Sequence, residues 1–149
     1  MPKLVPILFM CICLTFNCTN YIDYKILFDK YQGSVDVHIS TPANIPYVSC
    51  TPNGKSYVLS TNLNNLDNLL KNISLKNVQG YTFFINDTNL SNITNRLGLQ
   101  YYDVNQNEIL AYSSLIPFSI DLDGKVYNTQ IVQKSDQIVI GFPMILGSY

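Results

Sequence analysis

Three consecutive N-x-[ST] triplets lie within residues 86–94, NDTNLSNIT, with acceptor positions at Asn86, Asn89 and Asn92. A fourth triplet begins at Asn72, and a fifth, at Asn17, falls close to the start of the chain. In a chain that enters the secretory pathway, the side-chain amide of such an asparagine accepts an oligosaccharide. The chemistry predicted by these residues is therefore N-glycosylation at Asn72 and within the 86–94 cluster.

The cluster lies between two apolar stretches, 78–85 and 97–102, where a surface loop is expected. A loop accepts a bulky sugar without disturbing the core. Two other interpretations remain open: a polar turn that carries no sugar, or a short helix with Leu90, Ile93 and Leu97 on one face.

His38 is the sole histidine of the chain and lies in an alternating segment, 34–40. Val35, Val37 and Ile39 are expected to face one side of a strand, and His38 the solvent on the other. Nucleophilic triads and metal sites usually need a histidine with partners, and the chain has no GxSxG-type motif. No catalytic residue is assigned, and the sequence favours a binding protein over an enzyme.

Residues 103–108, DVNQNE, resemble the start of a calcium loop, with Asp103, Asn105 and Asn107 at its first, third and fifth positions. The glycine required next is replaced by Glu108, and the glutamate required at position 12 by Ser114. A hairpin turn is the better interpretation, and no metal site is predicted.

Asp121 and Asp123 alternate around Leu122, but Gly124 follows directly and makes them typical turn residues. The chain contains no Walker loop, dinucleotide fingerprint or Cys-x-x-Cys pair. No cofactor is therefore predicted.

Tyrosines gather in the C-terminal third of the chain, where a sheet is expected. Tyrosine joins a large apolar face to a polar tip and is enriched at interfaces, although strand propensity explains it equally well. A possible binding face for a protein or glycan partner is formed by Tyr101, Tyr102, Tyr112 and Tyr127.

The first 17 residues are typical of a secretory signal peptide, with Lys3 followed by an apolar run over 4–16. Thirteen apolar residues are too few to span a bilayer, which takes about 20. Cleavage is expected between residues 15 and 20, which leaves 18–149 as a single β-rich domain, secreted or in the lumen of the endoplasmic reticulum. No stable membrane span is expected after cleavage.

Which of the four cysteines remain in the mature chain, and how they pair, depends on that cleavage. Cys11 and Cys13 leave with the signal peptide, and an oxidising compartment would favour a Cys18–Cys50 disulfide if cleavage precedes Cys18. Otherwise Cys50 is alone, and is either buried or paired between two chains.

A length of 149 residues corresponds to one domain, and the net charge of −1 comes with only 13% charged residues. No basic stripe is present, so nucleic-acid binding is not expected. Seventeen asparagines and 11 tyrosines are typical of an AT-rich genome, such as that of many viruses.

Short apolar runs separated by turn residues predict an antiparallel β domain. One segment, 62–73, has helical spacing instead, with Leu63, Leu66, Leu70 and Ile73 on one face. The expected fold class is mainly β (α+β): an antiparallel sheet, sandwich or barrel with one short amphipathic helix around 62–73. Strands are expected over 24–31, 34–40, 47–50, 56–61, 80–85, 99–104, 108–114, 116–122, 125–132 and 137–142, the last five forming an up-and-down sheet.

These features favour a small secreted, N-glycosylated, β-rich binding protein that recognises a partner with an exposed sheet face or edge, and its composition leaves a viral origin open. Two alternatives remain open: a secreted hydrolase-like enzyme, and a structural or assembly subunit of a particle. The identity of the partner and the oligomeric state do not follow from the sequence.

Overall fold

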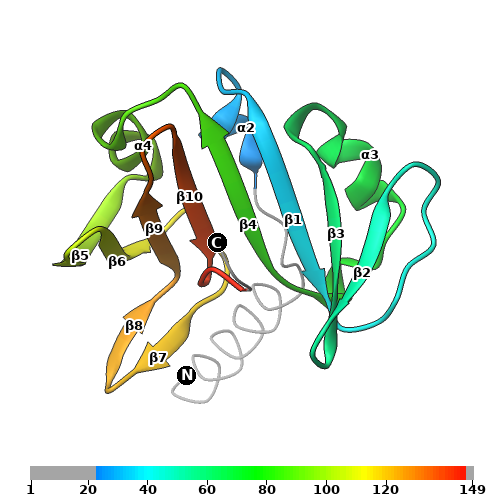
Figure 1. The fold of residues 1–149 in the computed structure, drawn as a ribbon. Helices are drawn as coiled ribbons and strands as arrows, with labels where there is room; N and C mark the ends of the chain where they lie inside the picture. The colour runs from blue at the N-terminus through cyan, green and yellow to red at the C-terminus, as the bar shows by residue number, and fades with distance from the viewer. Residues whose placement is uncertain (1–22, 147–149) are drawn as a thin grey trace, which may run out of the picture.

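The computed structural model describes residues 23–146. It shows a mainly β fold, as predicted: an eight-stranded antiparallel sheet with the strand order β2-β3-β1-β4-β10-β9-β6-β5, and a separate two-stranded sheet, β7-β8 (Figure 1). The large sheet is open, with β2 and β5 at its two edges, and forms no closed barrel. The expected signal peptide, its cleavage site, Asn17 and Cys18 lie outside the described residues.

The strands are β1 (Gly33–Ile39), β2 (Ser49–Asn53), β3 (Ser56–Asn62), β4 (Val78–Asn86), β5 (Leu99–Asn105), β6 (Glu108–Ser113), β7 (Ile120–Leu122), β8 (Lys125–Tyr127), β9 (Thr129–Gln133) and β10 (Gln137–Phe142). The α-helices are α2 (Tyr24–Phe28), α3 (Leu66–Lys71) and α4 (Leu90–Leu97), and two short 3₁₀ turns, η1 (Leu63–Asn65) and η2 (Leu75–Asn77), flank α3.

The C-terminal strands β5, β6, β9 and β10 lie in chain order, so this part of the sheet is up-and-down. The predicted strand over 116–122 is not part of it, because only Ile120–Leu122 forms a strand and it pairs with β8 in the separate sheet. The chain leaves the large sheet between β6 and β9 to form the β7–β8 hairpin, whose turn residues Asp123 (φ 53°) and Gly124 (φ 81°) both have positive φ. Aspartate followed by glycine is well suited to such a turn. Asn128 anchors the return to the sheet, because its amide bonds the backbone N–H and carbonyl of Ser113, each at 2.8 Å.

The N-terminal hairpin β2–β3 turns directly after Asn53. Asn53 is paired with Ser56 in the ladder, and Gly54 has a positive φ, 62°. The turn is therefore Gly54-Lys55, and glycine supplies the required conformation at its first position.

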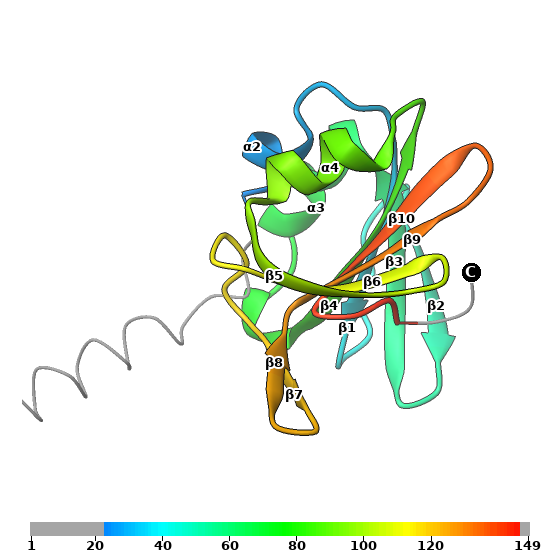
Figure 2. The same cartoon turned by 90° about the vertical axis from the view of Figure 1, so that its left-hand side faces the viewer.

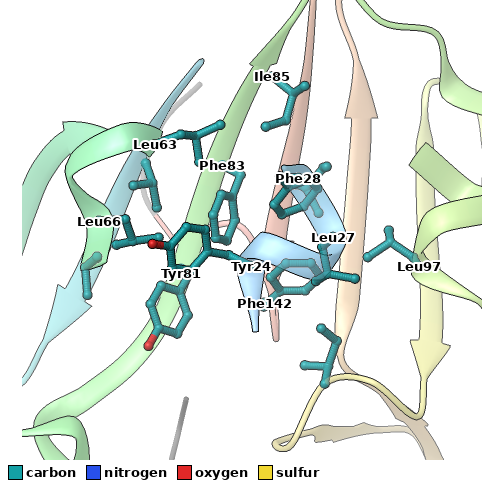
Figure 3. Packing of buried hydrophobic residues seen from close by; sticks show 14 of the residues in the cluster. Tyr24, Leu27, Phe28, Leu63, Leu66, Tyr81, Phe83, Ile85, Leu97 and Phe142 are labelled. Carbon is teal, nitrogen blue, oxygen red and sulfur yellow. The ribbon is translucent and has the colours of Figure 1, made fainter. Parts of the chain in front are cut away.

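Helices α2, α3 and α4 lie on one face of the large sheet (Figure 2). Tyr81, Phe83 and Ile85 of β4 are fully buried between this face and the helices. Rings from three elements meet there: Phe83 lies 4.7 Å from Phe28 and 5.7 Å from Phe142, between ring centroids (Figure 3). This aromatic and aliphatic cluster is the core.

The strand predicted over 24–31 is wrong, because Tyr24–Phe28 forms α2. Tyr24, Leu27 and Phe28 are buried, which is the i, i+3, i+4 spacing of a helix face. These three side chains cover Phe83 and its neighbours, and a strand would have pointed them to opposite sides.

The helix predicted around 62–73 is confirmed, as η1 followed by α3. Leu63, Leu66 and Leu70 are buried as predicted, and Leu69 joins them. Ile73 lies beyond the end of α3 and packs against the core only partly buried.

The opposite face of the sheet is partly covered by the chain's own segment Pro143–Leu146. Two glycines make room for it: a Cβ at Gly80 would lie 3.2 Å from a methyl carbon of Leu146, and one at Gly141 would lie 2.1 Å from the backbone nitrogen of Ile145. The Ile145 N–H donates to Gln130 Oε1 at 2.8 Å. The segment is thus held against the sheet by close backbone approach and one hydrogen bond.

Gly141→Ala should therefore destabilise the protein. The added methyl group meets backbone rather than a movable side chain, and such overpacking costs about 1–3 kcal/mol. Urea unfolding of the variant should show a lower midpoint with an unchanged slope. Ser135→Ala, in the exposed β9–β10 turn, is the control and should leave the midpoint in place; an unchanged midpoint for Gly141→Ala would show that the segment is not packed here.

Candidate binding surface

Strand β5 is a free edge of the large sheet. It pairs with β6, from Leu99↔Ser113 to Asn105↔Glu108, and has no neighbour on its other side among the described residues. A free edge presents unpaired backbone N–H and C=O groups at regular spacing, which is a template for another strand. The backbone of Leu99–Asn105 is thus available for hydrogen bonding to a partner.

The side chains on the helix side of β5 are apolar and exposed. Tyr102 and Val104 alternate along the strand, with 59% and 62% of their surface exposed. They face α4 across a groove with a volume of about 700 Å³. The groove is lined by Leu90, Ser91, Thr94, Asn95, Gly98, Leu99, Tyr102, Val104 and Ile109. We refer to these residues and the free edge of β5 as the α4–β5 groove.

Helix α4 forms one wall of this groove, and it bears out the short-helix interpretation that was left open for residues 86–94. Asn89 is the N-cap: its Oδ1 accepts the Asn92 backbone N–H at 2.9 Å. Ile93 and Leu97 are buried, and the helix ends at Gly98 with φ 56°. The short-helix alternative is therefore correct from Leu90 onward, and the loop is confined to the residues before it.

The four predicted tyrosines do not form one face. Tyr101 and Tyr112 are register partners whose rings stack at 5.5 Å on the face opposite the helices. Tyr127 packs edge-on against Tyr101 at 6.3 Å and is buried. Tyr102 lies on the helix side, because adjacent residues of a strand point to opposite faces.

Lys125 and Asp103 tie the tyrosine cluster together. Lys125 Nζ lies 2.7 Å from Asp103 Oδ2 and 5.3 Å from the centre of the Tyr101 ring. The Tyr127 hydroxyl also donates to Asp103. The hydrogen bond from Lys125, and then that from Tyr127, lowers the pKa of the Asp103 carboxyl. The rings of Tyr101, Tyr112 and Tyr127 are thus engaged with each other and with this ion pair.

The four predicted sugar acceptors, Asn72, Asn86, Asn89 and Asn92, are all exposed. Asn86 accepts a hydrogen bond from Gln137 Nε2 at 2.9 Å, and Asn72 Nδ2 donates to the Asn68 carbonyl oxygen at 2.6 Å. Their exposure is compatible with sugar attachment, and their occupancy stays a prediction.

Cys50 is half-buried on the edge strand β2 and forms no disulfide with any described residue. Since Cys18 lies outside the described part, the Cys18–Cys50 disulfide stays a prediction.

His38 is not the solvent-facing residue that the alternation predicts. It lies opposite Val35 and Val37 as expected, but only 1% of its surface is exposed. The reason is its position on an inner strand, beside Gly80, over which Leu146 folds. Its Nε2 is 3.1 Å from Thr82 Oγ1, and its Nδ1 is buried with no partner. Burial lowers the pKa of His38, with Asp36 opposing the shift.

The calcium-like segment 103–108 forms the β5–β6 hairpin, as favoured above. Within residues 23–146 no group of three or more His, Cys, Asp and Glu side chains is arranged to hold a metal ion. Asp121 acts as a turn residue, accepting the Gly124 N–H at 2.8 Å.

The groove residues were missed by the sequence analysis, except for Tyr102. Two signals point to them: Tyr102 and Val104 alternate up to a two-residue turn, and Ile109 follows directly across it in register with Val104. The apolar residues on one side of the β5–β6 hairpin could be recognised in the sequence, but the position of β5 at the edge of the sheet could not.

Comparison with protein-family models, curated protein sequences and solved structures found no match to this chain. None of the helices between residues 23 and 146 has the length and apolar character needed to cross a bilayer.

The stability of the protein should fall on acidification because of His38. Its pKa is below the ordinary value of 6.5 in the folded protein, so the unfolded chain binds the proton more readily. The contribution of the neutral imidazole to the free energy of unfolding is fully present above pH 6.5 and is lost as the pH falls below that value. We expect the free energy of unfolding to drop between pH 7 and pH 5.

The matched variant His38→Gln keeps a polar group for Thr82 and removes the titration. Since the chain has no other histidine, its unfolding free energy should vary much less over this pH range. Equal pH dependence of the two proteins would contradict the assignment.

Asp103→Asn should lower the stability at pH 7, because it removes the carboxylate that Lys125 and Tyr127 contact. Because the pKa of Asp103 is lowered in the folded protein, the stabilisation by its carboxylate is fully present above pH 3.8, the ordinary pKa of an aspartate. It is lost as the pH falls through the pKa of Asp103 in the folded protein. The difference between the two proteins should therefore shrink at pH 3 and below. Lys125→Met should cause a similar loss of stability at pH 7. The double variant should lose less stability than the sum of the losses in the two single variants; additive losses would show that Asp103 and Lys125 are not coupled.

Proposed function

We propose that this chain is a small secreted, N-glycosylated binding protein that captures an extended segment of a protein partner in the α4–β5 groove. The observation that carries this proposal is the coincidence of a free strand edge with exposed apolar side chains beside a helix. Tyr102 and Val104 lie on the edge strand itself, and Leu90 of α4 lies across the groove.

The physical basis is strand addition. An extended peptide pairs its backbone with the free edge of a sheet, and pockets for its alternate side chains give specificity. Here the β5 backbone would provide the hydrogen bonds, and the groove would receive every second side chain of the peptide. Apolar side chains at alternate positions fit a lining made chiefly of leucine, valine, isoleucine and tyrosine carbons.

The predicted sugars are compatible with an open groove. Ser91, Thr94 and Asn95 form the wall of the groove on α4, whereas Asn92 lines a different hollow, beside the β9–β10 turn. With 100° between successive residues of an α-helix, Asn92 lies on the side of α4 turned away from the centre of this wall. A sugar on Asn92 would therefore cover the neighbouring surface and leave the groove free.

The proposal is tested by selecting peptides from a random display library on the glycosylated protein secreted from eukaryotic cells. Selected peptides should carry apolar residues at alternating positions. The paired substitution Tyr102→Glu and Val104→Lys should weaken their binding by about tenfold or more, since it places charges where apolar contacts are expected. Affinity is measured by titration calorimetry.

Leu122→Lys is the matched control, because Leu122 is an exposed apolar residue on β7, outside the groove. It should leave the affinity unchanged. Equal affinities for the groove variant and the parent protein would overturn the proposal. A dimer of the parent protein that is lost in the groove variant, seen by sedimentation, would instead make a second copy the occupant and favour a particle subunit.

A further inference from the structure

A second hollow lies between the β1–β2 connection and α3. These two segments are on the β2 side of the sheet, away from α4 and β5 (Figure 1). The volume of the hollow is about 410 Å³. It combines apolar side chains with three asparagine amides and two hydroxyl-bearing side chains, Thr61 and Tyr47. The lining residues are Ile45, Pro46, Tyr47, Val48, Thr61, Asn65, Asn68, Leu69 and Asn72.

Tyr47 lines this hollow in a backbone conformation that is rare for a bulky residue. The Val48 N–H donates to the Ile45 carbonyl oxygen at 3.2 Å, so Pro46 and Tyr47 are the two central residues of a turn. Tyr47 has φ 65°, at a position where turns of this kind favour glycine or asparagine. Its side chain is fully exposed and gains nothing from burial. A bulky aromatic residue held in a rare backbone conformation is a marker of a functional position.

Asn72, a predicted sugar acceptor, lines the same hollow. It caps the C-terminal end of α3 and begins the sequon Asn72-Ile73-Ser74. Glycosylation transfers the oligosaccharide from a lipid diphosphate donor to Nδ2, which loses one proton and keeps the other. The remaining N–H can still donate to the Asn68 carbonyl oxygen, which Nδ2 contacts at 2.6 Å.

We propose that the first N-acetylglucosamine attached to Asn72 packs into this hollow against the ring of Tyr47. This inference rests on the proposed secretion and N-glycosylation of the chain. A pyranose ring has an apolar C–H face that suits an aromatic ring. Its hydroxyl and acetamido groups suit the amides of Asn65 and Asn68 and the hydroxyl of Thr61, which line the same hollow.

The test uses the full chain secreted from eukaryotic cells, with Thr88→Ala, Ser91→Ala and Thr94→Ala removing the sequons of the 86–94 cluster. An endoglycosidase trims the oligosaccharide on Asn72 to a single N-acetylglucosamine, which is verified by mass. The unglycosylated reference is the same protein with Ser74→Ala, which keeps Asn72 itself. The Tm of both proteins is measured with Tyr47 present and with Tyr47→Ala.

We expect the single sugar to raise the Tm by about 2–4 °C when Tyr47 is present, and this increment to disappear in Tyr47→Ala. The matched control carries a single trimmed sugar on Asn92, with Ser74→Ala, Thr88→Ala and Ser91→Ala. In this control, Tyr47→Ala should not change the effect of the sugar. Nuclear Overhauser effects between protons of the sugar on Asn72 and the Tyr47 ring should report the contact directly.

An increment that survives Tyr47→Ala, or a sugar on Asn72 without contacts to the Tyr47 ring, would overturn the inference. An unmodified Asn72 on a secreted chain with sugar in the 86–94 cluster would also overturn it and leave the proposed secreted glycoprotein standing. A chain that is neither secreted nor glycosylated would overturn both proposals.

Discussion

The burial of β4 between β1 and β10 is the constraint on which the rest of the structure depends. Val78–Asn86 pairs with β1 from Gly33↔Ile85 onward and with β10 from Gln137↔Asn86 to Phe142↔Tyr81. Strands from the two halves of the chain become one sheet only through these two ladders. The helix-side residues Tyr81, Phe83 and Ile85 then provide the apolar surface that α2, α3 and α4 cover. Each of these short helices gains its stability from this packing rather than from its own length.

The same arrangement places the candidate binding surface at the periphery. The covering helices shield the middle of the sheet, while β5 lies at the edge, with Tyr102 and Val104 exposed beside α4. Apolar side chains at an uncovered edge favour pairing with another strand, and many proteins block such edges with charge or proline. Asp103 is the one charged residue of β5, and it is turned to the opposite face, where it binds Lys125. The edge is therefore unblocked on the side that faces the groove.

Local patterns in the sequence predicted most strands, because the two-residue alternation and the turn residues act over short distances. The Asp123-Gly124 turn and the leucine stripe of 62–73 are examples. The errors come from tertiary context. The segment 24–31 is apolar enough for a strand, but the core needed Tyr24, Leu27 and Phe28 on one side, which only a helix provides.

His38 and the tyrosines show two different limits. Burial of His38 depends on a C-terminal segment more than 100 residues away in the chain, and no local pattern could reveal it. The division of the tyrosines was accessible from the sequence, because adjacent Tyr101 and Tyr102 must point to opposite faces of any strand. The groove itself needed the strand order, since β5 and β6 look alike in the sequence and only one of them is an edge.

Hydrogen exchange of the secreted protein tests most directly whether β5 is the binding edge. Amide exchange is compared with and without the tightest peptide from the display selection. Capture by strand addition predicts slower exchange in Leu99–Asn105, with no change in Ser49–Asn53, the strand at the other edge. Protection of β2 instead of β5, or protection confined to the face of Tyr101 and Tyr112, would contradict the account.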